Sequence, residues 1–523
     1  MKKTKWILAL MLIMSIVLSS CGDAGGGTGT GAGAGTGAGA GTGTGAAADV
    51  RDSVNISVTM VIQSIEPHDI SSSLIENQIK HKMYEGLYWF NDQIGEFEPR
   101  LAVSHSISDD GLVYTFYLRE GVKFHNGEVM KSSDVVFSIN RGMRNPSLNT
   151  FTAPIADVQA DGDYRVKITL HHAFAPFIHH ISRVYIMSEK AVLETGCENM
   201  ATVVSMAGSG PYFISSFRPD TLIEMTAFEH YWRGIADIRT INIRPFTDVF
   251  TGLIAFESGE LDFFNVPAAD WARISANPNF ETQVVPQNHI SFFRLNPDRG
   301  SLANPQVRLA IQYALDRNAQ NIVSFDGLAK IATNTVHPIY VRGTPSQPSI
   351  HFEKNIERAR EILAEAGYPN GVHVGRILYI AGLYFEAMAQ NFQATLAQAG
   401  ITVELEGMEQ ATVISRMRAG DFDILTMGWG NQFDYDTVEH MMEGVEGTME
   451  TEAFREVREL FARARVETDD AARFAIYEEV EEKIMAMNIW LSVFHRPSLF
   501  AWNRDLNASS GAQFFTVYDW SWN

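Results

Sequence analysis

The chain has few cysteines and no excess of positive charge, and each shortage excludes a class of protein. It contains 523 residues but only two cysteines, Cys21 and Cys197. Because Cys21 is assigned below to a lipid anchor, Cys197 has no partner, and we expect a body without internal disulfides that is stabilised by its core. The formal net charge is −21 at pH 7. This charge excludes nucleic acid as a partner, because phosphates require a basic surface.

The sequence also lacks the common signatures of enzymes and of a membrane-spanning body. It contains no HExxH motif, no GxSxG motif and no P-loop. After residue 18 no apolar run is long enough to span a bilayer. We therefore predict a protein that is not an enzyme and has no cofactor and no metal site. The pairs His171–His172 and His179–His180 leave a metal site as a less favoured alternative, and an unrecognised secreted hydrolase is the least favoured one.

The N-terminus has the pattern of an export signal that ends in a lipid-attachment cysteine. Met1–Trp6 carries three lysines, Ile7–Leu18 is almost entirely apolar, and Leu18–Cys21 closes the run with small residues. The apolar run is too short for a mature membrane-spanning helix, and the small residues suit cleavage before Cys21. We predict a lipoprotein signal peptide over residues 1–21 with lipidation of Cys21, which would anchor the protein to the membrane.

Residues 22–48 are predicted to form a flexible tether. They are almost entirely Gly, Ala and Thr, and such side chains have too little apolar area to offset the entropy of ordering the chain. A coil of this length has an end-to-end distance of about 25–30 Å. The folded body from about residue 49 would therefore reorient near the membrane surface.

The body shows the periodicities of strands first and of helices later. Apolar and polar residues alternate in Val54–Val58, Tyr114–Leu118 and Asp163–Leu170, which predicts half-buried strands. From Val307 to Leu315 the apolar residues recur at helical spacing. Further helices are expected over residues 454–466 and 471–487, and a strand over 372–374. The mixture predicts an α/β protein of two or three domains.

A series of short motifs in the body resembles the family 5 (peptide/nickel-type) extracellular solute-binding proteins of ABC importers, such as the oligopeptide- and dipeptide-binding lipoproteins. The motifs, in chain order, are MYEGL at 83–87, PRLA at 99–102, LREGVKFHNG at 118–127, GSGPY at 208–212, YWRG at 231–234, FESGELD at 256–262, NPQVRLAIQYALDR at 304–317 and the pair Gly428-Trp429. The resemblance covers essentially everything after the tether.

The resemblance implies a two-lobed periplasmic-binding-protein type II fold with an additional inserted domain and a ligand cleft between the lobes. Lobe I would be discontinuous, and lobe II would follow it as one stretch. The expected boundaries are 49–78 plus 208–297 plus 492–523 for lobe I, 79–207 for the inserted domain, and 298–491 for lobe II. Two or more chain crossings between lobes would form a hinge that closes on the ligand.

The expected binding site departs from that of the peptide binders. In those relatives an aspartate three residues after the tryptophan of the Gly-Trp pair binds the α-ammonium group of the peptide, and Gln432 stands there in this chain. A neutral amide cannot replace the charge pairing, so Asp434 or Asp436 would have to take over. A pocket tryptophan of oligopeptide binders corresponds to Gln410. These changes weaken the case for an ordinary di- or oligopeptide ligand.

The remaining candidate ligand-binding residues are aromatic, amide and glycine residues. Tyr384 and Phe385, like the tryptophan of the Gly-Trp pair, offer ring faces, although a core position is the favoured alternative for the first two. Amide groups of the site donate and accept hydrogen bonds. Arg376 and Arg416 are less favoured candidates for a ligand carboxylate. The full predicted set is Gly428, Trp429, Gly430, Asn431, Gln432, Asp434, Gln410, Tyr384 and Phe385.

The predicted function is capture of a small peptide or peptide-like ligand outside the cytoplasm and its delivery to an ABC permease with its ATPase subunits. The protein would be a monomer, lipid-anchored to the cell membrane, in the periplasmic space or on the outer face of the cytoplasmic membrane. A non-peptide solute (nickel chelate, haem, opine or oligosaccharide) and a surface signalling receptor with the same fold stay open as alternatives.

Overall fold

The structure is a computed structural model that describes residues 51–69, 74–92, 94–350, 352–430, 433–439, 452–511 and 517–523. The chain divides into two units, Met1–Val50 and Arg51–Asn523, and the fold described here is that of the second unit. The predicted signal peptide, the lipidation site Cys21 and the tether lie outside the described residues. So do Asn431 and Gln432.

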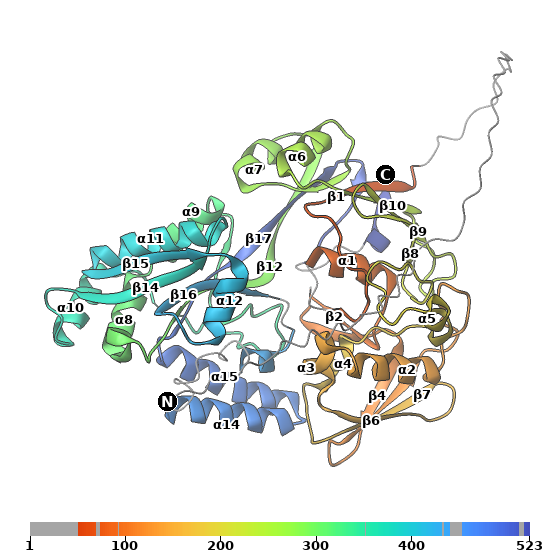
Figure 1. Cartoon of the computed structure of the whole chain (residues 1–523), viewed down its shortest axis with the longest axis horizontal. Helices are drawn as coiled ribbons and strands as arrows, with labels where there is room; N and C mark the ends of the chain where they lie inside the picture. Colours follow the sequence, from red (N-terminus) through yellow and green to blue (C-terminus); the bar gives the residue numbers. More distant parts are fainter. Residues whose placement is uncertain are drawn as a thin grey trace, which may run out of the picture. The chain divides into compact units, whose positions relative to one another are not determined.

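One large mixed sheet forms the framework of this unit (Figure 1). Its strands, in spatial order, are β15 (Ile401–Met408), β14 (Val372–Ile380), β16 (Ile424–Gly430), β12 (Phe280–Leu295), β17 (Trp490–Asn503), β11 (Phe263–Asn265), β1 (Ser53–Val58), β10 (Thr240–Pro245), β9 (Leu222–Ala227) and β8 (Tyr212–Arg218), and β13 (Lys330–Ile331) pairs with β17. We call β11, β1, β10, β9 and β8 the first half of the sheet, and β16, β14 and β15 the second half.

Two long antiparallel strands, β12 and β17, join the two halves. β11 pairs with the C-terminal part of β17, whereas β16 pairs with the C-terminal part of β12. Between these parts the β12–β17 ladder is irregular, with a register shift between Pro286 and Ile290. Both strands thus cross from one half to the other through an irregular segment, as a hinge between two lobes requires.

A smaller four-stranded sheet lies within the first part of the chain. Its order is β4 (Ala102–Ile107), β5 (Val113–Leu118), β7 (Arg165–Leu170) and β6 (Ile155–Ala160), and two further pairs are β2 (Tyr88–Asn91) with β3 (Glu96–Pro99) and β18 (Leu506–Asn507) with β19 (Ser521–Trp522). The alternation of buried and half-exposed residues along β1 and β5 confirms the predicted strands. The strand predicted over 163–170 is β7.

Helices cover the sheets. They are α1 (Leu74–Met83), α2 (Ser132–Met143), α3 (Asn149–Thr152), α4 (Phe177–Ser182), α5 (Glu189–Thr195), α6 (Val249–Glu257), α7 (Ala268–Ser275), α8 (Pro305–Ala314), α9 (Arg317–Phe325), α10 (Ile356–Glu365), α11 (Tyr384–Gln398), α12 (Gln410–Arg418), α14 (Glu452–Val466) and α15 (Asp470–Ala486). The helices predicted near 307–315, 454–466 and 471–487 are confirmed as α8, α14 and α15, and the strand at 372–374 begins β14. None of the helices in the described ranges is long and apolar enough to cross a membrane.

Local sequence explains where these helices begin and what they bury. Asn304 accepts a hydrogen bond from the backbone N–H of Gln306, and Pro305 occupies the first turn, so α8 starts there. Its apolar stripe, which includes Val307 and Ile311, is fully buried. The stripe belongs to a core cluster shared with α11 and the second half of the large sheet.

The buried apolar residues gather in four clusters. One fills the second half of the large sheet, where Phe293 of β12 stacks on Phe392 of α11 with ring centroids 4.1 Å apart. A second underlies the first half, and a third fills the small sheet with α2 and α4. The fourth lies under α6 and α7. The α/β class is thereby established, and the domain boundaries given above stay predictions.

Candidate functional site

Several of the predicted site residues lie at one edge of the second half of the sheet. β14, β15 and β16 are parallel, and their carboxyl ends therefore share an edge. Tyr384 begins α11 soon after β14 ends, Gln410 begins α12 directly after β15, and Trp429 is near the end of β16. In open α/β sheets, ligands bind outside the carboxyl ends of the strands. The sequence thus selected residues from three segments that meet at such an edge.

The C-terminal part of β16 extends beyond its pairing with β14. In the described part of the chain, β14 pairs with β16 through Ile424 and Leu425, and from Thr426 to Gly430 the ladder continues on the β12 side. The N–H and C=O groups on the other side of this segment are therefore not used by β14. A strand edge that its neighbouring strand does not cover can pair with the backbone of an extended peptide.

The predicted aromatic residues Tyr384 and Trp429 lie on opposite faces of the sheet. In the β12–β16 pair, Ser291 is opposite Gly428 and Ile290 is opposite Trp429. Successive side chains of a strand point to opposite faces, so Ser291 and Trp429 belong to different faces. The hydroxyl of Tyr384 lies 3.0 Å from that of Ser291. The two rings therefore cannot stack on one side of a ligand as a pair.

Tyr384 and Phe385 differ in their access to a ligand. Phe385 is only 5% exposed and belongs to the core of the second half. Tyr384 is half-buried, and its ring centroid lies 5.0 Å from that of Phe325 at the end of α9. Burial raises the pKa of Tyr384, and the positive charge of Arg496 opposes this shift. Tyr384 is thus a neutral hydroxyl within the electrostatic reach of a cation.

Gly428 and Gly430 make room for the ring of His289 on the neighbouring strand. A Cβ atom on Gly428 would collide with the imidazole of His289, and one on Gly430 would lie 3.0 Å from the carbonyl oxygen of Asn288. Burial holds the pKa of His289 well below its ordinary value, and the charge of Arg496 adds to this effect. The glycines of the Gly-Trp-Gly segment therefore have a packing role beside the site.

Trp429 is half-buried against the core of the second half. Its indole N–H is buried and has no hydrogen-bond acceptor within the described ranges. Leaving a buried donor unpaired costs about 1–3 kcal/mol, so an acceptor on a ligand would be favoured here. Gln410, by contrast, is exposed at the start of α12. The roles of both residues in binding stay predictions.

Asp434 and Asp436 are buried and already have partners. Asp434 is 1% exposed and accepts hydrogen bonds from the backbone N–H of Asp436 at 3.0 Å and from the hydroxyl of Tyr477 at 3.3 Å. Asp436 accepts two hydrogen bonds from Arg465, at 2.8 and 3.3 Å. A ligand ammonium group at either carboxylate would have to compete with these groups. The neighbouring Asn431 and Gln432 lie outside the described residues.

Arg376 and Arg416 are engaged in a surface network of ion pairs. Arg376 lies 3.1 Å from Glu406 and 3.7 Å from Asp423. Arg416 lies 2.9 Å from both Glu406 and Asp421. Because three carboxylates already neutralise these two guanidinium groups, they offer little attraction to a carboxylate of a ligand.

A cavity of about 510 Å³ opens at the hinge, which we call the hinge cavity. It is lined by the ends of β1 and β11, the start of α7, the end of α9, and the central parts of β12 and β17. Phe325, which contacts Tyr384, belongs to its wall. The hinge cavity therefore takes its lining from the first half of the large sheet, from the joining strands β12 and β17, and from α9, whose Phe325 packs against the core of the second half. It borders the predicted site on the Tyr384 side.

Two polar residues of the hinge cavity were missed in the sequence, Gln287 on β12 and Arg496 on β17. The guanidinium Nε of Arg496 donates to the side-chain oxygen of Gln287 at 2.8 Å. A signal for Arg496 was present, because Trp490–Asn503 is otherwise free of Arg, Lys, Asp and Glu. A single such charge within a long buried strand is unusual unless the charge has a function or a partner. No comparable signal marks Gln287.

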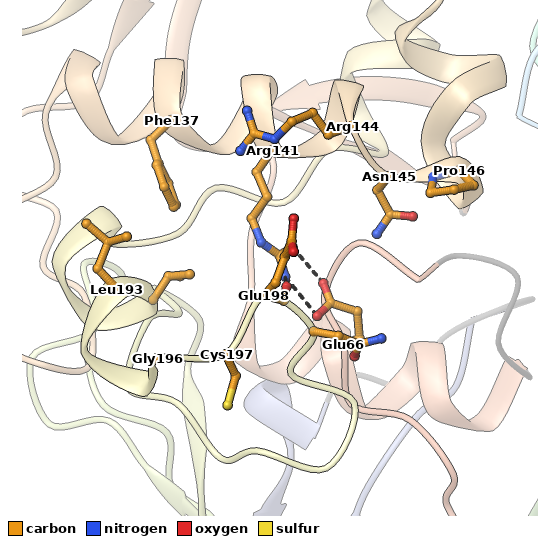
Figure 2. Close-up of a pocket in the computed structure, with 12 residues that line it drawn as sticks. Glu66, Phe137, Arg141, Arg144, Asn145, Pro146, Leu193, Gly196, Cys197 and Glu198 are labelled. Atoms are coloured by element: carbon orange, nitrogen blue, oxygen red, sulfur yellow. Dashed lines mark hydrogen bonds and ion pairs between the residues drawn. The ribbon is translucent and has the colours of Figure 1, made fainter. Parts of the chain in front are cut away.

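Another cavity lies elsewhere in the described part of the chain and has a volume of about 620 Å³ (Figure 2). It is formed by α2, α5 and the loop that follows β1, and we call it the α2–α5 cavity. Figure 2 shows Arg141 reaching down from α2 to Glu66, with Cys197 at one side. The ion pair of Arg141 and Glu66 has an N–O distance of 2.6 Å. Two of the charged side chains that line this cavity, Arg141 and Glu66, are therefore paired with each other.

The histidine pairs do not form a metal site in the described part of the chain. His179 and His180 are buried in α4, and their rings contact Phe151 and Phe174. Within the described ranges there is no group of three or more His, Cys, Asp or Glu side chains that could hold a metal ion.

Comparison with known proteins identifies the family. The model of the bacterial extracellular solute-binding proteins, family 5, matches residues 96–443, which is most of the described unit. The chain belongs to this family. The family 5 assignment confirms the resemblance noted in the sequence, and it places the chain among solute-binding components of ABC transporters.

Individual relatives of this family 5 protein agree in sequence and in fold. The glutathione-binding protein GsiB of Escherichia coli O1:K1 is 29% identical over 363 residues, which cover 68% of this chain and 69% of GsiB. The ABC transporter substrate-binding protein CtaP of Listeria monocytogenes has a TM-score of 0.80 at 21% identity and covers 91% of this chain and all of CtaP. NikA of Brucella suis, in complex with Fe(III)-EDTA, also reaches 0.80, at 23% identity, and covers 90% of this chain and 100% of NikA. The predicted two-lobed α/β fold is thereby confirmed.

Proposed function

We propose that this chain captures a peptide or peptide-like solute outside the cytoplasm and delivers it to an ABC permease. The observation that carries the proposal is the hinge cavity, which is lined by the first half of the sheet, the joining strands β12 and β17, and the end of α9 next to Tyr384. A ligand in such a place stabilises the closed arrangement of two lobes by contacting both. Binding without chemistry follows, so the protein is not an enzyme.

Two features favour a peptide-like solute. The relative GsiB is named for glutathione, which is a tripeptide. The edge of β16 beyond Leu425 is not paired with β14, and its residues up to Trp429 can hydrogen-bond to an extended backbone. Neutral polar groups of the hinge cavity, such as Thr59 and Asn265, can hydrogen-bond to amide groups. A non-peptide solute or a signalling receptor would use the same cavity with other contacts.

The test of capture is native mass spectrometry of the full chain purified in detergent, followed by titration with a tripeptide library. We expect a bound peptide mass at a dissociation constant near micromolar, which corresponds to about −8 kcal/mol. Turnover of the peptides, instead of stoichiometric binding, would contradict the proposal and favour the hydrolase alternative.

The lipid anchor at Cys21 is part of the proposal. Cleavage before Cys21 and acylation of its thiol would hold the body at the outer face of a membrane. The second cysteine provides a matched control. We expect Cys21→Ser to move the protein from the membrane fraction to the soluble fraction or to leave the precursor uncleaved, and Cys197→Ser to stay on the membrane. Membrane retention of mature Cys21→Ser would contradict the anchor.

A further inference from the structure

The hinge cavity contains a single charged side chain among its described lining residues, and that side chain is Arg496. The rest of the described lining is apolar or neutral, although the whole sequence has 62 acidic residues and a formal net charge of −21. The absence of a carboxylate from this wall is therefore not a reflection of composition. The local charge of the hinge cavity is positive in a protein that is negative overall.

A short relay of hydrogen bonds fixes the orientation of Arg496. The side-chain nitrogen of Gln287 donates to the hydroxyl of Ser498 at 2.5 Å, and the side-chain oxygen of Gln287 accepts from Nε of Arg496 at 2.8 Å. Gln287 and Ser498 are 8% and 4% exposed, so this support is buried. The relay uses the Nε–H of the guanidinium group, and the hydrogen bond to Gln287 does not involve the two terminal nitrogens, Nη1 and Nη2.

The terminal nitrogens of Arg496 have no carboxylate partner within the described ranges. The nearby groups on which its charge acts are a phenol and an imidazole, not carboxylates. The positive charge of Arg496 acts on Tyr384 and on His289, both of which are neutral. Arg496 is half-buried, so water screens it only in part. A planar guanidinium group in such a position is suited to a carboxylate, which it can bind through two parallel hydrogen bonds.

We propose that Arg496 binds a carboxylate of the captured solute in the hinge cavity, and that Gln287 positions the guanidinium group for this contact. The inference rests on the proposed capture function and narrows it, because it assigns the solute to the class of carboxylates. A peptide with a free carboxyl group belongs to this class, and its amide does not. Solutes without an anionic group would lack this contact.

The experiment compares one tripeptide library prepared in two forms, with free carboxyl ends and with amidated ends. Binding of each form to the full chain is measured by native mass spectrometry, and the best pair is titrated by calorimetry. We expect the acid to bind about 10- to 100-fold more tightly than the amide, as is usual for a charge-assisted hydrogen-bonded pair. This comparison uses the unaltered protein, so it does not depend on the folding of a variant.

Two variants connect the preference to Arg496. Arg496→Gln should lower the affinity for the acid to about that for the amide, so that the preference for the acid disappears. Arg418→Gln removes the same charge from the exposed end of α12 and should keep the preference. Gln287→Glu places a carboxylate against Arg496, so it should weaken binding of the acid and spare the amide. A merely structural role of Gln287 would weaken both forms equally.

The outcomes separate the inference from the function on which it rests. Equal binding of acid and amide by the unaltered protein would overturn the carboxylate contact and leave peptide capture intact. A preference that survives Arg496→Gln would overturn the assignment to Arg496. Failure of both libraries to bind would overturn peptide capture itself, and the inference with it.

Discussion

The α2–α5 cavity and the hinge cavity each contain an arginine that hydrogen-bonds to a side chain of the same cavity, but the two partners differ in charge. In the α2–α5 cavity, Arg141 donates to both carboxylate oxygens of Glu66, at 2.6 and 2.9 Å. In the hinge cavity, Arg496 donates to the neutral side chain of Gln287. Arg141 is thus neutralised by a carboxylate, whereas Arg496 is not, although Arg144 and Glu198 also line the α2–α5 cavity. The state of the charge identifies the ligand site better than the volume does.

The chemistry of Glu66 explains why the α2–α5 cavity is structural. Burial disfavours the charged form of Glu66, but the hydrogen bonds and charge of Arg141 outweigh burial and lower the pKa of the carboxyl group. The backbone N–H groups of His68 and Met200 donate to the same carboxylate. The ion pair therefore fastens the loop after β1 to α2, and it has no hydrogen-bonding capacity directed to a solute.

The largest expected effect comes from breaking this satisfied pair. Glu66→Gln removes the charge that neutralises buried Arg141, and we expect a loss of about 3–5 kcal/mol in the free energy of unfolding, measured by urea denaturation. Glu260→Gln, which breaks an exposed pair with Arg244, should cost at most about 1 kcal/mol. Unchanged stability together with lost peptide binding in Glu66→Gln would transfer the ligand site to the α2–α5 cavity.

The next largest effect is on the pH dependence of stability, and it tests whether burial raises the pKa of Asp436. Burial raises its pKa to about 6, against the attraction of Arg465. A carboxyl group whose pKa is higher when folded contributes stability below its unfolded pKa and loses that contribution as the pH rises through the folded value. Between pH 4 and 6 the protein should therefore lose on the order of 2–3 kcal/mol through this group.

Asp436→Asn should remove this part of the pH dependence. The measurement is urea denaturation at a series of pH values between 4 and 6, with Asp163→Asn as the control because Asp163 is exposed. A variant whose pH profile is parallel to that of the unaltered protein would show that folding does not raise the pKa of Asp436.

The smallest expected effect is on stability, and it concerns the arginine of the hinge cavity. Arg496→Gln removes a half-buried cation whose described partner is a neutral amide, so the free energy of unfolding should change by about 1 kcal/mol or less. Thermal and urea denaturation would measure this. A loss as large as that of Glu66→Gln would make Arg496 a structural arginine.

The sequence predicted the elements that depend on local periodicity. The alternation along Val54–Val58 and the apolar stripe from Val307 to Leu315 became β1 and α8, because each pattern exposes one face and buries the other. The family resemblance added the α/β two-lobed fold. It also selected residues at the carboxyl edge of β14, β15 and β16, from three segments that are distant in sequence.

The sequence could not predict which charges would find partners. Arg376 and Arg416 were candidates for a ligand carboxylate, yet strand pairing brings Glu406 to both of them. The faces of Tyr384 and Trp429 depend on the register of β12 against β16, which no local pattern fixes. The hinge cavity combines β1, β11, β12 and β17, whose contacts form only when the chain has folded.

The most direct test of the account is a crystal structure of the protein with the tightest-binding tripeptide acid. The account predicts that the peptide lies in the hinge cavity with its carboxylate within hydrogen-bond distance of the terminal nitrogens of Arg496. A peptide bound in the α2–α5 cavity, or bound at the hinge with its carboxylate directed away from Arg496, would contradict it.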